Sequence, residues 1–374
     1  MKRVHISQVD ALFSDGSYAI EFLFYYREGL NTKRLREALR RLSTPFWPMF
    51  GEYRDGLISY DKYREDAVYA EEASGEELDT REIREGGFEV CSRFGLPDSE
   101  RLFFLKAMRF KNGTVLVPKL KHLAGDGYSY FYFLSLLAVL TQRSRFSLKS
   151  SLTRLLYGPH HRRTILRDFP FRGGPQETTP QDNRFAIKLE EVSRAEVKSL
   201  IKGAAAANNL RLSSNDVLSA LSLKKLVSIQ GESWGESIGL TMPIDVRPQI
   251  KEFGRRFFGN GIMLHTIELK KEEVKNSPAK EIALRIRSSM PSVSKKTYQN
   301  YLAGLEQTFT SGGTQNFRLY DPSRGCLVTN LSKLPSEKLD FGTGPPELVL
   351  PLTTGKNSVA ILASNGNYVL RFAY

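Results

Sequence analysis

Residues 121–130 read KHLAGDGYSY, and this stretch decides how the chain is interpreted. His122, one of only five histidines, stands four residues before an Asp-Gly pair, and Asp126 lies between Gly125 and Gly127. Glycine permits tight turns and positive φ, so we expect a turn here. An imidazole titrates near neutral pH and suits a catalytic base. A polar turn with an incidental histidine is the alternative.

The flanking sequence places this turn between a strand and a helix. Upstream, RLFFLKAMRF (101–110) and TVLVPKLKHL (114–123) flank KNG (111–113), and Asn-Gly between β-rich runs indicates a hairpin. Downstream, YFYFLSLLAVL (130–140) is long enough for a buried helix but only about half of a membrane-spanning one. His122 is therefore expected at the end of a strand, and we expect no membrane association.

Strand and helix patterns mix in both halves of the chain, which indicates an α/β class with a mixed sheet and flanking helices in each half. Apolar patterning predicts strands at 18–26, 184–192, 237–248, 325–331, 347–352, 357–363 and 368–374, and helices at 33–42, from 193, at 212–228 and within 277–305. A length of 374 residues favours two domains. We expect an N-terminal domain at 1–160, a Pro/Gly-rich crossover linker at 161–183 and a C-terminal domain at 184–374.

The formal net charge is +13, and the basic residues are spread along the chain. The densest run, KRLREALRRL (33–42), carries leucines and an alanine at helical spacing, so its basic residues form the solvated face of an amphipathic helix. No nucleic-acid-binding motif accompanies the charge, and we expect no nucleic-acid partner.

The cysteines and the N-terminal residues indicate the cellular compartment of the protein. Cys91 and Cys326 are the only two cysteines and stand in no metal or redox spacing. This predicts a reducing compartment and no metal site. MKRVHISQVDALF has no continuous apolar segment of a secretion signal, so we expect a cytoplasmic protein.

Neither a G-x-S-x-G nucleophile elbow nor a phosphate-binding G-x-x-x-x-G-K-[ST] loop is present.

In its wider setting, HLAGDG (122–127) resembles the HxxxDG motif of CoA-dependent acyltransferases, most closely the BAHD type. Counterparts of other landmarks of that family follow the same order: ISQVDALF (6–13), LSSNDVLSAL (212–221), IDVRPQI (244–250), FFGNGI (257–262) and DFGTG (340–344). Thr343 replaces the tryptophan of DFGWG and TNL (329–331) replaces TSW, which bears on the acyl or acceptor pocket. The chain is shorter than the plant enzymes, which indicates trimmed loops and a bacterial branch.

The resemblance implies two chloramphenicol acetyltransferase-like domains with an active-site channel between them. It further implies a monomer that uses acyl-CoA as cosubstrate and a small-molecule acceptor. A thioester is already activated, so one base that takes the acceptor proton is sufficient, and His122 is that base. By its place in the resembling stretch, Thr329 is the candidate donor to the oxyanion, with Asn330 as a helper.

Other matched residues are expected to support the site. The resemblance implies that Asp126 turns away from the substrate and pairs with Arg247, which holds the turn of His122 and Gly127. Asp340, Gly342 and Gly344 are expected to be structural. Ser213 and Ser214 are candidates for contacting CoA at a helix N-terminus, with simple N-capping as the alternative.

Two alternatives stay open. The acyl group could come from the phosphopantetheine arm of an acyl carrier protein, as in condensation-type relatives, with the basic surface docking an acidic carrier. The chain could also be a non-catalytic binding protein on the same fold, since fold does not dictate function.

Overall fold

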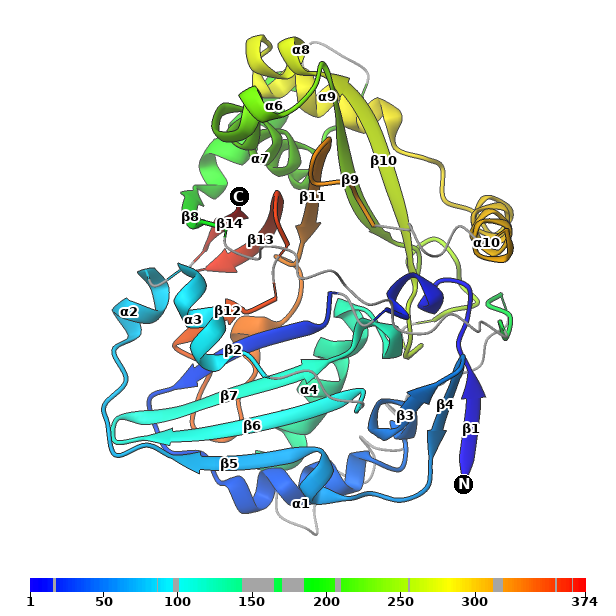
Figure 1. Ribbon diagram of the computed structural model, residues 1–374. Coiled ribbons are helices and arrows are strands. Elements are labelled where there is room, and N and C mark those ends of the chain that lie inside the picture. The colour runs from blue at the N-terminus through cyan, green and yellow to red at the C-terminus, as the bar shows by residue number, and fades with distance from the viewer. Residues whose placement is uncertain are drawn as a thin grey trace.

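The computed structural model describes residues 1–15, 18–85, 87–96, 101–142, 165–169, 185–205, 210–254, 256–311, 319–353, 355–364 and 366–374. Within these residues the chain forms a five-stranded sheet, a six-stranded sheet and a small three-stranded sheet, with helices packed against the two larger ones (Figure 1). The small sheet consists of β1 (Lys2–His5), β3 (Glu52–Arg54) and β4 (Leu57–Tyr60). The α/β class predicted from the sequence is confirmed.

The five-stranded sheet has the order β12-β2-β7-β6-β5. Its strands are β2 (Ile20–Tyr26), β5 (Tyr69–Ala73), β6 (Phe103–Phe110), β7 (Gly113–Leu120) and β12 (Leu348–Pro351). Successive residues of β2 point to opposite faces of the sheet, and those on both faces are mostly apolar, because helices cover both faces. Phe22 and Phe24 face the core with α1 (Thr32–Leu42) and α4 (Gly127–Gln142), whereas Leu23 faces α2 (Thr80–Glu85) and α3 (Gly87–Phe94).

The predicted hairpin at Asn112-Gly113 joins β6 to β7. Gly113 has a φ of 159°, and a Cβ there would lie 2.3 Å from the carbonyl oxygen of Tyr26 on the neighbouring strand. Only glycine fits this close approach. β7 ends at Leu120, and a single 3-10 turn, η4 (His122–Ala124), leads into α4. His122 thus lies between a strand and a helix, as predicted.

The six-stranded sheet has the order β10-β9-β11-β13-β14-β8. Its strands are β8 (Ile187–Val192), β9 (Ser237–Asp245), β10 (Ile262–Lys270), β11 (Gly325–Asn330), β13 (Ser358–Ser364) and β14 (Asn367–Ala373). One face is covered by the helices α6 (Arg194–Ala205), α7 (Ser214–Gln230) and α9 (Ala279–Ser289), which enclose a second core. The other face turns toward the five-stranded sheet (Figure 1).

The helical region expected within 277–305 is two helices. α9 ends at Ser289, and α10 (Lys295–Thr310) begins after a break that contains Pro291. Proline lacks an N–H and clashes with the preceding turn, so it ends a helix that apolar spacing alone would extend. Ser294 is the N-cap of α10 and forms a capping box with Thr297. The short helix α8 (Lys271–Asn276) precedes α9.

Strand β12 links the two large sheets. The chain leaves the six-stranded sheet after β11, pairs β12 antiparallel to β2 in the other sheet, and returns as β13. Residues of both halves also share one hydrophobic core, which includes Phe22 of β2 and Leu362 of β13. The predicted linker 161–183 lies outside the described residues except at 165–169, so the domain boundaries stay predictions. Within the described segments, no helix combines the length and apolar character that crossing a bilayer requires.

Candidate active site

The His122 ring is held from one side by an aromatic partner. Phe13, at the end of the 3-10 helix η1 (Asp10–Phe13), stacks on the imidazole with ring centroids 3.7 Å apart and planes inclined by 19°. His122 is partly buried and keeps some exposure. Phe13 therefore closes one face of the imidazole.

Burial lowers the pKa of His122 below its usual value, although the negative charge of Asp126, the histidine's own backbone and the Asn260 side chain act in the opposite direction. A lowered pKa keeps the ring neutral near pH 7, which is the form that accepts a proton. Nδ1 is buried and makes no hydrogen bond of ordinary geometry with the described part of the chain.

A buried asparagine holds the backbone of the histidine turn. Nδ2 of Asn260 donates to the carbonyl oxygen of His122 at 2.8 Å and to Oδ1 of Asp10 at 2.9 Å. Asp10 also accepts from the backbone N–H of Ser7 at 2.8 Å. The stretches ISQVDALF, HLAGDG and FFGNGI therefore meet at one point. Neither Asn260 nor Asp10 was predicted as a site residue from the sequence, where the available signal was a polar residue inside an apolar stretch.

The predicted ion pair between Asp126 and Arg247 is confirmed. The two side chains are 4% and 5% exposed, and they pair through both guanidinium Nη atoms at 2.8 and 3.0 Å. Asp126 also accepts from the backbone N–H groups of Ser129 at 3.0 Å and Gly261 at 2.9 Å. Burial alone would raise the pKa of Asp126, but Arg247 and these hydrogen bonds outweigh it, so the pKa lies below its usual value. The carboxylate is ionised and directed at Arg247.

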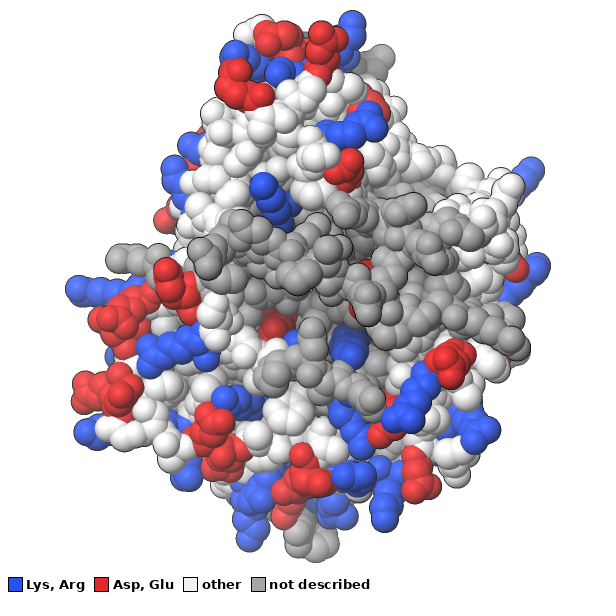
Figure 2. Space-filling model, viewed as in Figure 1, with Lys and Arg blue, Asp and Glu red and all other residues white. Residues whose placement is uncertain are grey.

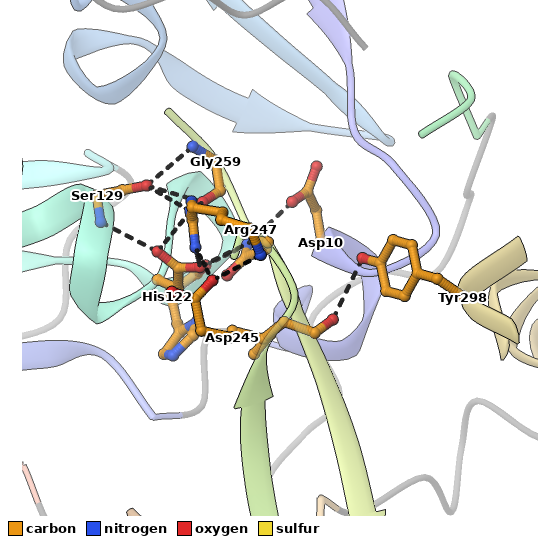
Figure 3. Close-up of polar contacts among 11 residues, drawn as sticks. Asp10, His122, Ser129, Asp245, Arg247, Gly259 and Tyr298 are labelled. Atoms are coloured by element: carbon orange, nitrogen blue, oxygen red, sulfur yellow. Dashed lines mark hydrogen bonds and ion pairs between the residues drawn. The ribbon is translucent and has the colours of Figure 1, made fainter. Parts of the chain in front are cut away.

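Arg247 joins three segments of the chain (Figure 3). Beyond Asp126, it donates to Asp245 Oδ1 at 3.1 Å, to the Gly259 carbonyl at 2.9 Å and to Ser129 Oγ at 3.3 Å. Its guanidinium carbon lies 4.7 Å from the centre of the Tyr128 ring. The end of β9, the segment 257–262 and the start of α4 are thereby held together, and the role of Ser129 emerged only from the structure.

The turn that the two glycines predict is present, but neither of them has a positive φ in the left-handed region. Gly125 has an extended backbone with φ 168°, and Gly127 begins α4. A Cβ on Gly125 would lie 3.0 Å from Cβ of Ser129, and one on Gly127 would lie 3.4 Å from a methyl group of Leu334. Positive φ occurs at Gly259 instead, at 143°.

Thr329 and Asn330 end strand β11. Thr329 is partly buried. Asn330 donates to Asn215 Oδ1 at 2.8 Å and accepts from the backbone and hydroxyl of Ser332 at 3.0 and 2.7 Å, so most of its amide is engaged. A Cβ on Gly127 would lie 3.8 Å from Leu331, the residue after Asn330. The end of β11 therefore lies beside the histidine turn.

Ser213 is the N-cap of α7. Its Oγ accepts from the backbone N–H of Asp216 at 3.4 Å, and Asp216 accepts in return from the Ser213 backbone at 2.6 Å. Asp216 also forms an ion pair with Arg287 at 2.5 Å. Ser214 is the first residue of α7 and is partly buried. The N-capping alternative for Ser213 is thus present, and contact of either serine with CoA stays a prediction.

The DFGTG stretch forms a turn built around Asp340. Its Oδ1 accepts from the backbone N–H groups of Gly342 at 2.7 Å and Gly344 at 3.0 Å, whose φ values are 112° and 92°. Phe341 is buried edge-on against Tyr26 at 5.7 Å between ring centroids. These contacts join the turn to the five-stranded sheet, as a structural role requires.

The described surface shows charges of both signs. On the face in Figure 2, Lys and Arg side chains alternate with Asp and Glu over the lower part of the molecule. The net charge of +13 is therefore not gathered into one basic patch on the described part of this face. Among the described residues, no three His, Cys, Asp or Glu side chains come together in a way that could hold a metal ion.

Removing the Phe13 ring tests its influence on the imidazole. In Phe13→Ala, water reaches the covered ring face, so the pKa of His122 is expected to rise toward the ordinary value of about 6.5. NMR titration of the histidine ring protons measures this pKa, with His122→Gln identifying the resonance. Phe110→Ala, which removes a ring from the end of β6, is the control and leaves the value unchanged. An unchanged or lower pKa in Phe13→Ala contradicts the expected effect.

Comparisons with known proteins bear on the family and the fold. A family model described as "Transferase family" matches residues 93–367. Anthranilate N-benzoyltransferase protein 1 of Dianthus caryophyllus is 23% identical over 339 residues, which cover 83% of this chain and 75% of that protein. TRI101 of F. graminearum, solved with ethyl coenzyme A, superposes with a TM-score of 0.77 at 15% identity and covers 100% of this chain and 94% of its own. Vinorine synthase superposes with a TM-score of 0.74 at 16% identity, covering 100% and 89%. The two-domain chloramphenicol acetyltransferase-like fold predicted from the sequence is confirmed.

Proposed function

This chain belongs to the Transferase family, the BAHD-type acyl-CoA-dependent acyltransferases, and we propose that it moves an acyl group from acyl-CoA to a hydroxyl or amine of a small-molecule acceptor with His122 as general base. The observation that carries this proposal is the imidazole itself. Its pKa is lowered by burial, Phe13 covers one face, and the Asp126–Arg247 pair supports its turn.

The proposed reaction needs one proton carrier. Neutral His122 accepts the proton of the acceptor O–H or N–H as that atom attacks the thioester carbonyl. The tetrahedral adduct then breaks its C–S bond, and the imidazolium returns the proton to the departing CoA thiolate. The new ester or amide bond replaces the thioester, and the histidine ends in its starting form. Such acid–base assistance contributes about 10²–10⁴-fold.

The oxyanion of the adduct needs a preorganised donor, and we assign the Thr329 hydroxyl to it with Asn330 as helper. Thr329→Val keeps the shape and removes the hydroxyl. We expect kcat to fall by about 10²–10³-fold with little change in KM, because the interaction forms only in the transition state. Steady-state kinetics of thiol release measures both constants. Thr266→Val, on β10 in the same sheet, is the matched control. A Thr329→Val variant that changes KM and keeps kcat would contradict the assignment.

The remaining assignments follow from the HxxxDG resemblance and from composition. Ser213 and Ser214, at the N-terminus of α7, are proposed to meet CoA, because backbone N–H groups at a helix N-terminus favour anionic groups. A monomer, a bacterial origin and a cytoplasmic location stay predictions, the last one resting on two unpaired cysteines.

Release of free CoA thiol across acyl-CoAs and acceptors tests the function. The relatives' names direct the first choices: benzoyl-CoA with anthranilate, then acetyl-CoA with hydroxylated acceptors such as deoxynivalenol, which was solved bound to F. graminearum TRI101. We expect turnover with at least one pair and none in His122→Ala. If turnover occurs only when the acyl group is attached to a carrier protein, the acyl donor is the carrier protein and not CoA. No turnover with either donor would favour a binding protein.

A further inference from the structure

A groove outside the proposed catalytic residues lies between β12 and the face of the six-stranded sheet at β13, β14 and β8. It encloses about 530 Å³. Its lining is mixed, and the aliphatic part, which we call its floor, includes Leu189, Leu348, Leu350, Leu362 and Val369. Leu189, on β8, is 36% exposed at the edge of the groove. Neither His122 nor Thr329 lines this groove.

The rim carries carboxylates that the described part of the chain leaves without a cation. Glu337 and Glu191 line the groove, and no described Lys or Arg forms an ion pair with either. Glu347 differs, because Arg27 binds it through two hydrogen bonds. Arg84 is the one described cation that lines the groove. Both residues are exposed, and Oε1 of Glu191 also accepts a hydrogen bond from Nδ2 of Asn367 at 2.5 Å, so both carboxylates are accessible to a cation at the rim.

Ser336 adds an independent indication of a ligand. This residue is 6% exposed and lines the groove beside Glu337. Its Oγ makes no hydrogen bond with a described residue and, unlike the Oγ atoms of Ser219 and Ser222, is not fully buried. The small exposed fraction of Ser336 opens into the groove, where a ligand group can satisfy it.

We propose that this groove binds a small amphipathic cation, with an aromatic or alkyl body on the aliphatic floor and an ammonium group at the rim. The ammonium donates to the carboxylates of Glu337 and Glu191 and to Oγ of Ser336. Burying the hydrocarbon supplies affinity of about 25 cal/mol per Å² of apolar surface removed from water, and the carboxylates select the cation over a neutral or anionic molecule of equal shape. This site goes beyond the proposed acyl transfer.

The loop after β11 connects the groove to the histidine turn. Leu331 and Leu334 lie against the position where Gly127 would carry a Cβ. Ser336 follows Leu334 by two residues, which span at most about 7 Å of extended chain. A ligand in the groove therefore contacts a loop that also contacts the turn, while binding itself requires neither His122 nor Thr329.

Calorimetric titration with three molecules of nearly equal shape tests the proposal: 2-phenylethylamine, 2-phenylethanol and phenylacetate. We expect the amine to bind at least about fivefold more tightly than the alcohol, and the carboxylate most weakly. Glu337→Gln should lower affinity for the amine by about five- to tenfold and leave the alcohol unchanged. Ala363→Trp, which fills the groove, should abolish binding of both. The control Glu281→Gln, on the exposed face of α9, should change neither.

The same titrations in His122→Ala separate this site from catalysis, since binding should persist when the proposed base is absent. Equal binding of the three molecules overturns the proposal. So does amine binding that withstands both Glu337→Gln and Ala363→Trp, or absence of binding by all three. Thermal melting of each variant shows that it remains folded, so that a lost signal reports on the groove.

Discussion

His122→Ala is expected to lose acyl transfer by at least about 10²–10⁴-fold, with the loss in kcat and little change in the KM for acyl-CoA. The ring lies at the start of η4 with Phe13 on one face, and no other described imidazole lies at that turn. A methyl group cannot accept the acceptor proton, so attack on the thioester must proceed without a base. Thiol release at saturating acyl-CoA measures the loss.

The wild-type pH profile gives the same base a second signature. Because burial lowers the pKa of His122, the imidazolium forms at a lower pH than in an ordinary histidine, whose pKa is about 6.5. Activity should therefore still be present at about pH 6.5 and be lost only at lower pH, where the ring becomes protonated and can no longer act as a base. His265→Ala is a matched control, since that ring lies on β10 near Ser289 and should leave rate and profile unchanged. Full activity in His122→Ala would remove the proposed mechanism.

Asp126→Ala is expected to destabilise the protein by about 3–5 kcal/mol, because the buried guanidinium of Arg247 loses its buried carboxylate and keeps only the more exposed Asp245. Arg247 is 8% exposed, so water cannot replace the lost partner. The N–H groups of Ser129 and Gly261 lose their acceptor as well. Urea unfolding followed by circular dichroism measures the change.

Asp126→Ala should also change how the stability of the protein depends on pH. The pKa of Asp126 is lowered in the folded protein, so its ion pair stabilises fully above the unfolded value of about 3.9 and is lost as pH falls through the folded pKa. Asp126→Ala should remove that part of the acid sensitivity. Glu65→Ala, which breaks the exposed pair with Arg36, is the control and should change stability little.

Two further variants separate structure from chemistry. The double variant Asp126→Leu/Arg247→Met removes both charges, and it should recover part of the stability lost in Asp126→Ala, because no isolated charge stays buried. If Asp126→Ala instead keeps its stability and loses only rate, Asp126 orients His122 and does not serve as a structural anchor. Thermal melting beside thiol-release kinetics distinguishes these results.

The sequence by itself determined the local elements around the site. Asn112-Gly113 specified a hairpin, and the apolar run after Gly127 specified a buried helix, because turn chemistry and apolar periodicity are written in neighbouring residues. Leucines at helical spacing in 33–42 likewise specified α1. The pairing of Asp126 with Arg247 came from matched motifs, since no local rule joins residues 121 positions apart.

Only the tertiary structure decided which distant groups meet. Asn260 bridges Asp10 and His122, and Phe13 stacks on the ring. Strand β12 crosses into the other sheet, and Gly125 packs closely against Ser129 without a left-handed φ. Each of these depends on how whole layers pack, because a contact between remote residues is selected by the shape and buried polarity of everything around it. The local sequence around each of these residues does not specify which remote residue it contacts.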